Sequence, residues 1–108
     1  MKQIYEALKY TPSEAELEAT LTEAVEEYVN VFKAYGNKFD ALETALEIVV
    51  DYLDHTDDDT YCTVRFKNGY IEYPELVIEH EYTDYIDLLP VMILLRKQYD
   101  KQTKENRP

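Results

Sequence analysis

The stretch KFDALETALEIVVDYLDHTDDDTYCTVRF, residues 38–66, decides the fold because its hydrophobic period changes partway along. From Phe39 to Leu53 the apolar residues recur every three or four positions, which is the spacing of one face of a helix. From Cys62 onward apolar and polar residues alternate, which is the spacing of a half-buried β-strand. The acidic segment HTDDDT, residues 55–60, separates the two patterns. The stretch therefore predicts a helix that is followed directly by a sheet.

Two further helices are predicted before this stretch. A short one covers residues 2–10. A longer one begins after Thr11, which we expect to form a capping box with Glu14, and it ends at Gly36, which suits a left-handed C-cap. Asn37 then caps the helix of the opening stretch. Because only Gly36 and Asn37 separate the two helices, the helices must form an antiparallel hairpin. The expected buried face of the longer helix comprises Leu17, Leu21, Ala24, Val25, Tyr28, Phe32 and Tyr35.

After the period change, the pair Asn68-Gly69 predicts a β-hairpin closed by a two-residue type I′ turn. Counting outward from that turn pairs Phe66 with Ile71. A third strand is expected over residues 75–82, just after Pro74. The side chains that this register turns toward the core are Cys62, Val64, Phe66, Ile71 and Tyr73.

The chain closes with a C-terminal helix that we expect Asp87 to cap, with Pro90 in its first turn. Residues 101–108 are polar and are expected to form a frayed tail. A chain of 108 residues fits one domain, spanning 1–108. Helices, then a small three-stranded antiparallel sheet, then a helix define an α+β fold.

The formal net charge is −12, and it is concentrated in the helical half. Residues 13–60 contain fourteen acidic residues and only two basic ones, Lys33 and Lys38. Such a surface repels nucleic acid and anionic lipid and attracts basic surfaces. We therefore expect a basic protein as partner, with no direct nucleic-acid binding and no membrane binding.

Five of these acids form what we call the acidic stripe: Asp40, Glu43, Glu47, Asp51 and Asp54. On a helix they fall within roughly 80° of arc and extend over roughly 21 Å. Neighbouring like charges on a helix are unfavourable, so a surface selected for solubility alone would not need this arrangement. The other candidate partner-binding residues are Asp57, Asp58, Asp59, Glu16, Glu23, Glu27, Tyr70, Tyr82 and Tyr85.

Carboxylates about 5 Å apart on a helix approximate the pitch of backbone phosphates. We expect the chain to inhibit or regulate a nucleic-acid-handling enzyme by presenting this mimic to its basic groove. Phage or mobile-element antagonists of nucleases and nuclease-immunity proteins are functional analogies, without any sequence match. The ordinary explanation, a solvated face in an acidic protein, stays open.

The alternative function is a structural or assembly subunit that self-associates, for instance as a homodimer. The third helix and the C-terminal helix are apolar over much of their circumference, through residues such as Ile48, Met92 and Leu95. Apolar helix surface left uncovered in so small a domain would serve as a contact between copies. Its acidity would then serve solubility only.

Catalytic and metal-binding signatures are missing from the sequence. The chain has two histidines, one cysteine and no glycine-rich loop, so we expect neither enzymatic activity nor a cofactor. No metal site is predicted, although a loose cation site near residues 54–59 stays open. The single Cys62 and the lack of a long apolar run favour a soluble protein in the reducing cytoplasm.

Overall fold

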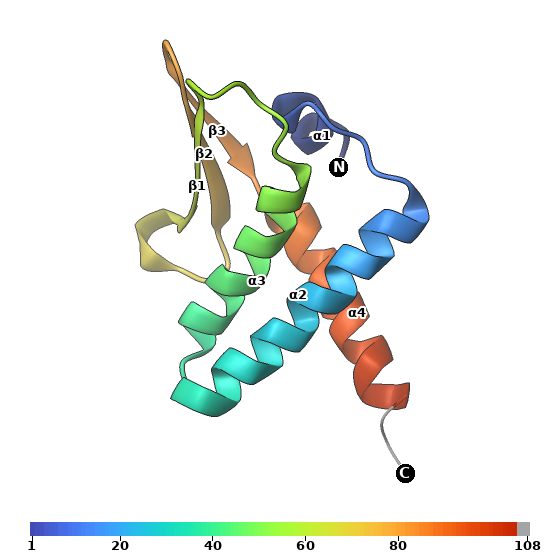
Figure 1. The fold of residues 1–108 in the computed structure, drawn as a ribbon. Helices are drawn as coiled ribbons and strands as arrows, with labels where there is room; N and C mark the ends of the chain where they lie inside the picture. Colours follow the sequence, from blue (N-terminus) through green and yellow to red (C-terminus); the bar gives the residue numbers. More distant parts are fainter. Residues whose placement is uncertain (106–108) are drawn as a thin grey trace.

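The computed structural model describes residues 1–105 and confirms the α+β fold, with helices before and after a small antiparallel sheet (Figure 1). Its elements are α1 (Lys2–Leu8), α2 (Glu14–Tyr35), α3 (Lys38–Leu53), β1 (Tyr61–Phe66), the short 3₁₀ turn η1 (Lys67–Gly69), β2 (Pro74–Glu79), β3 (Thr83–Asp87) and α4 (Leu89–Glu105).

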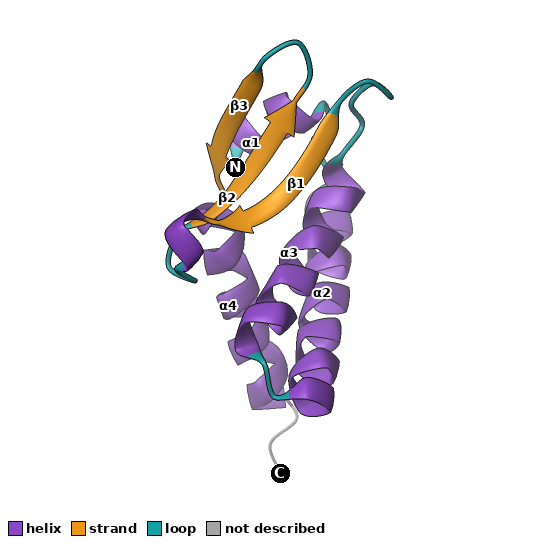
Figure 2. Ribbon diagram, turned by 90° about the vertical axis from the view of Figure 1, so that its left-hand side faces the viewer, coloured by secondary structure: helices purple, strands orange, loops and turns teal. Residues whose placement is uncertain are grey.

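The three strands form one antiparallel sheet in the order β1-β2-β3. Figure 2 looks onto the sheet, whose near face no helix covers, while the helices lie behind and beside it. The far face packs on the core through residues such as Val64, Leu76 and Ile86. The fold therefore leaves one face of the sheet without a helix over it, although Val77 at its centre is covered by neighbouring side chains.

The central helix is α3, which contacts α2 on one side and β1 on another. Leu46, Val49 and Leu53 are fully buried, as the sequence predicts. Ala41 and Ala45, which lie outside that predicted stripe, are also buried because α3 has neighbours on several sides. Phe39 at the start of α3 contacts the ring of Phe66 at the end of β1, with 4.5 Å between ring centroids.

The cap of α2 lies two residues later than predicted. Ser13 is the N-cap: its Oγ accepts a hydrogen bond from the Glu16 N–H at 3.2 Å and donates one to Glu16 Oε1 at 3.1 Å. The capping box is therefore Ser13 with Glu16, and Thr11 belongs to the linker. Gly36, with φ +66°, and the capping by Asn37 are as predicted.

The predicted turn forms, but the predicted strand register is wrong. Asn68 and Gly69 have φ values of 56° and 77°, and the Tyr70 N–H bonds the Lys67 carbonyl at 3.1 Å. A second turn follows, and pairing resumes only where Pro74 faces Phe66. The predicted second strand, residues 70–73, is therefore absent, because these residues form the connection and β2 takes the place beside β1. Tyr73 points to solvent, and Leu76 takes the core position opposite β1. Ile71 is half-buried in the connection.

The C-terminal half also differs from the prediction in its strands. The expected strand at 75–82 is β2, which ends at Glu79, and β3 was not expected. Asp87 Oδ1 accepts the Leu89 N–H at 2.9 Å and Pro90 lies in the first turn of α4, both as predicted. Helix α4 continues through Glu105, so residues 101–105 are helical; residues 106–108 lie outside the described part.

Aromatic residues near the ends of the predicted core faces are exposed. Phe32 and Tyr35 at the end of α2 are exposed, the latter to 77%, because the helical hairpin extends beyond the elements that cover it. Tyr73, also expected to be buried, is exposed as well, and so is Tyr99 on α4. The molecule is correspondingly elongated, with extents of 52 × 32 × 20 Å.

Candidate partner-binding surface

The solvent side of α3 consists of carboxylates. Three members of the acidic stripe, Asp40, Glu47 and Asp51, are the only exposed residues of α3 after Phe39. The other two are half-buried at the border of the stripe. The remaining sides of α3 carry the buried residues Ala41, Leu42, Ala45, Leu46, Val49, Val50 and Leu53. A well-packed helix thus holds the stripe in a fixed geometry.

The charges in the stripe repel one another. The pKa of Glu47 is raised by partial burial, and further by the charge of Glu43, its hydrogen bond with Glu43 and the charge of Asp51. The pKa of Asp51 is raised by partial burial and by the charge of Asp54. Within residues 1–105, no ion pair joins a stripe carboxylate to a lysine, arginine or histidine. A cationic partner would relieve this repulsion.

The stripe ends beside strand β1. Asp54 caps the end of α3 and accepts two hydrogen bonds from Thr56, one from its N–H at 3.0 Å and one from its hydroxyl at 2.5 Å. Burial, and then the Asp54 charge, raise the pKa of the Cys62 thiol to about 11. This thiol is therefore protonated at neutral pH and is a poor nucleophile.

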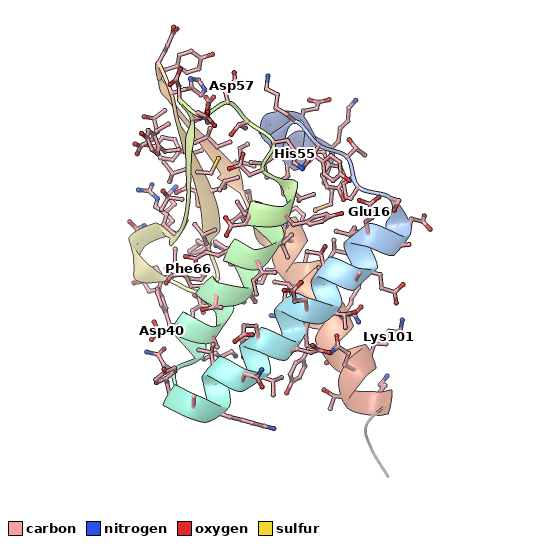
Figure 3. The ribbon with its side chains drawn as sticks, in the orientation of Figure 1. Glu16, Asp40, His55, Asp57, Phe66 and Lys101 are labelled. Carbon is pink, nitrogen blue, oxygen red and sulfur yellow. The ribbon has the colours of Figure 1, made fainter. Side chains whose placement is uncertain are left out.

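The triplet Asp57, Asp58 and Asp59 lies in the exposed loop that follows α3. Figure 3 shows Asp40 near the α2–α3 connection and Asp57 at the opposite end of the molecule, close to the β2–β3 turn. Asp57 and Asp59 line a hollow of about 710 Å³ there, together with Tyr82. The structure thus places this loop beyond the end of the stripe, next to one of the predicted tyrosines.

Tyrosines mark the uncovered face of the sheet and its two ends. Tyr85 lies on the outer face of β3, Tyr70 in the β1–β2 connection and Tyr82 in the β2–β3 turn, so these three predicted residues are spread along the sheet. Tyr61 and Tyr73 join them, and each of the five side chains is more than half exposed. Tyrosine is enriched in protein interfaces, so these exposed rings on the sheet and at its ends are candidate contacts for a partner.

On the uncovered face of the sheet, the guanidinium group of Arg65 contacts both a carboxylate and a tyrosine ring of the same chain. Arg65 donates from Nε to Glu75 Oε2 at 2.8 Å, and its guanidinium carbon lies 5.1 Å from the centroid of the Tyr85 ring. A carboxylate and an aromatic ring thus hold the same cation. The chemistry that we expect for a basic partner is present here within the chain.

Two of these tyrosines were missed in the sequence analysis for different reasons. Tyr61 alternates with the inward Cys62, and that alternation alone could have identified it as outward-facing. Tyr73 carries no such local signal, because the Asn68-Gly69 turn alone predicts a register in which its side chain faces the core.

Glu16 has partners within the molecule, unlike the stripe. Its Oε2 accepts hydrogen bonds from the Tyr10 hydroxyl, at 2.5 Å, and from the Tyr52 hydroxyl. These two bonds, with one from Ser13, lower the pKa of Glu16. The hydrogen bond between Tyr52 and Glu16 also raises the pKa of the Tyr52 hydroxyl. The Tyr10 ring also stacks on His55, with centroids 4.2 Å apart. Glu16 is therefore part of a cluster that joins the linker, α2 and α3.

The last two predicted acids, Glu23 and Glu27, are exposed on α2. No hydrogen bond or ion pair connects either of them to the stripe. They contribute to the charge of the molecule from a separate helix.

The part of the chain from residue 1 to 105 contains no group of three or more His, Cys, Asp or Glu side chains that could hold a metal ion. None of its helices has the length and apolar character needed to span a bilayer. Comparison with protein-family models, with curated proteins and with solved structures gave no match. The surface is therefore interpreted from its own chemistry.

Proposed function

We propose that this protein is a small acidic binding protein that inhibits or regulates a nucleic-acid-handling enzyme by docking the acidic stripe into its basic groove. The observation that carries the proposal is that every exposed position of α3 after Phe39 is a carboxylate without a cationic partner.

The geometry of α3 supports mimicry of a nucleic-acid backbone. The stripe runs from Asp40 to Asp54, and at 1.5 Å per residue this is roughly 21 Å of aligned negative charge. A groove that binds phosphates with Lys and Arg releases counterions on binding, and carboxylates in a comparable row would compete for the same cations. Because α3 is packed on the core, the carboxylates need little ordering on binding.

The tyrosines of the sheet would supply the short-range part of the affinity. Exposed aromatic rings beside carboxylates accept arginine side chains, as Tyr85 and Glu75 do with Arg65. Long-range steering would come from the stripe, and contact specificity from the tyrosines.

The test is capture of partners from a cell lysate by the immobilised protein at low and at high salt. We expect salt-sensitive capture of a basic nucleic-acid enzyme, abolished by the triple substitution Glu43→Gln, Glu47→Gln and Asp51→Asn. A matched control removes three charges elsewhere through Glu6→Gln, Glu14→Gln and Glu26→Gln, and should retain capture. Equal loss in both variants would indicate bulk charge and not a stripe, and normal capture by the stripe variant would exclude the stripe as the site.

A second candidate function, self-association, is favoured by exposed apolar side chains on two helices. Leu89 and Ile93 on α4 and Phe32 on α2 are exposed, whereas Met92 and Leu95 are buried and unavailable as contacts. A contact between copies would therefore use Ile93, and light scattering should show a salt-resistant oligomer that Ile93→Ser dissociates. A monomer at all concentrations would exclude this function.

A further inference from the structure

A pocket of about 420 Å³ opens between α2, α3 and α4, away from the acidic stripe. Its lining side chains come from α2, α3, α4 and the β1–β2 connection. Leu42 and Ala45 of α3 face Met92 and Leu95 of α4 across it, and all four are core residues. Ile71, from the β1–β2 connection, also lines it. The volume is in the range of small-molecule sites.

The polar groups of this pocket are mainly cationic. Lys38 at the start of α3 and Arg96 on α4 both line it, and neither forms an ion pair within residues 1–105. One carboxylate, Asp100, lies one helical turn beyond Arg96. The lining thus carries a net positive charge in a chain whose formal net charge is −12.

Two tyrosines complete the lining. The rings of Tyr28 and Tyr99 meet edge to face, with centroids 6.0 Å apart. Burial raises the pKa of the Tyr28 hydroxyl, and the Tyr99 charge raises it further. The Tyr28 hydroxyl is therefore a neutral donor for an anionic group at neutral pH.

We propose that this pocket binds a small amphipathic anion, an alkyl or aryl carboxylate whose apolar body lies against Leu42, Ala45 and Leu95 and whose carboxylate pairs with Arg96 and Lys38. An apolar wall favours the hydrophobic body, and a guanidinium favours a carboxylate through charge-assisted hydrogen bonds. The two cations select against neutral and cationic ligands of the same length. This site is independent of the proposed partner surface, since its residues belong to a different side of α3 and to α4.

The probes are octanoate, 1-octanol and octyltrimethylammonium, each kept below micelle-forming concentrations. Binding to the full chain is measured by titration calorimetry and by thermal unfolding. We expect octanoate to bind about tenfold or more tightly than the other two, since it alone gains charge-assisted bonds. Equal binding of all three probes, tighter binding of the cation, or no binding of octanoate would overturn the proposal.

Two substitutions on α4 change the lining charge in opposite directions. Arg96→Gln should weaken octanoate binding about tenfold, whereas Asp100→Asn should strengthen it about two- to threefold. Both residues are exposed on α4, so neither change is expected to prevent folding. A response of the same sign in both variants would show that the pocket does not select by charge.

Ala45→Leu tests the apolar wall. Added methyl groups should occupy the pocket and remove octanoate binding; because Ala45 is buried, the variant is also expected to melt below the native chain. If this variant fails to fold, the variants Arg96→Gln and Asp100→Asn still test the proposal. The stripe variant Glu43→Gln, Glu47→Gln and Asp51→Asn should bind octanoate within about twofold of the native chain, so the two proposals can fail separately. A dimer that Ala45→Leu dissociates would show instead that a second copy fills the pocket.

Discussion

Carboxylates on helices α2 and α3 are held in opposite ways. On α3, the exposed residues Glu47 and Asp51 have no cation beside them, and partial desolvation and neighbouring negative charges raise their pKa values. At the start of α2, Glu16 accepts hydrogen bonds from Tyr10 and Tyr52, and its pKa is lowered. The charge is the same, but the partners differ. Net charge alone thus does not distinguish these two groups of carboxylates, whereas their hydrogen-bond partners inside the fold do.

The largest expected effect comes from weakening the packing of α1, which holds the Glu16 cluster in place. Leu8 is fully buried, and its carbonyl accepts a hydrogen bond from the His55 backbone N–H at 2.8 Å. The His55 ring in turn stacks on the Tyr10 ring. Leu8→Ala should lower the free energy of unfolding by about 2–5 kcal/mol, because it leaves a cavity under α1. Urea denaturation measures the loss.

The control is Leu89→Ala at a more exposed position, which should change the free energy of unfolding by less than about 1 kcal/mol. In Leu8→Ala the pKa of Glu16 should also return toward its ordinary value, while that of Glu47 should not change. A loss below 1 kcal/mol in Leu8→Ala would mean that α1 does not anchor this cluster.

The pH dependence of stability distinguishes the two groups of carboxylates, because the pKa values of Glu47 and Asp51 are raised whereas that of Glu16 is lowered. The raised pKa values of Glu47 and Asp51 mean that their charged forms destabilise the fold at neutral pH and that this effect disappears on acidification. Glu47→Gln with Asp51→Asn should therefore stabilise the chain at pH 7 by about 0.2–0.5 kcal/mol for each like-charge contact removed, less any screening by solvent. The advantage should vanish below the ordinary carboxyl pKa values.

Glu16→Gln should behave in the opposite way. A lowered pKa contributes stability above the ordinary glutamate pKa, and this stability is lost as pH falls through the lowered value. The variant should thus melt below the native chain at pH 7 and approach it only at the acid end of the series. Thermal unfolding of both variants from pH 7 to pH 3 tests this, and shifts of the same sign at pH 7 would refute the contrast.

The smallest expected effect is at the border of the stripe. With its pKa raised to about 11, the Cys62 thiol should react with a disulfide reagent at pH 8 at least about tenfold more slowly than it does in the urea-unfolded chain. Because burial is the larger cause, Asp54→Asn should speed the reaction by only about twofold. If the Cys62 thiol reacted as fast as in the unfolded chain, neither burial nor the charge of Asp54 would act on it, and the stripe would not end beside β1.

The helices could be predicted from the sequence because their signals are local. Gly36 and Asn37 mark the hairpin through single-residue backbone and capping chemistry, and both act as predicted. The β register could not be counted from Asn68-Gly69 alone. The longer connection buries Leu76 and leaves Tyr73 in solvent, a tertiary gain that no turn rule contains. The five-residue strand β3, TDYID, is too polar to be recognised by its pattern.

The candidate site was predictable to a similar extent. The acidic stripe follows from helical spacing, so its position on the solvent side of α3 could be predicted. The cluster at Glu16 could not, because Tyr52 lies 36 residues away in the sequence. Periodicity also identified the apolar sides of α3 and α4 but not the separation between them, which creates the pocket.

The unequal distribution of charge between two helices has a consequence for how the molecule moves. Figure 3 shows Asp40 on one side of the molecule and Lys101 on the other, and the basic residues of α4 all lie between Arg96 and Lys104. The protein is therefore a permanent electric dipole as well as a polyanion. Near a positively charged surface it experiences a torque, and that torque rotates the side bearing the acidic stripe forward before any contact is made.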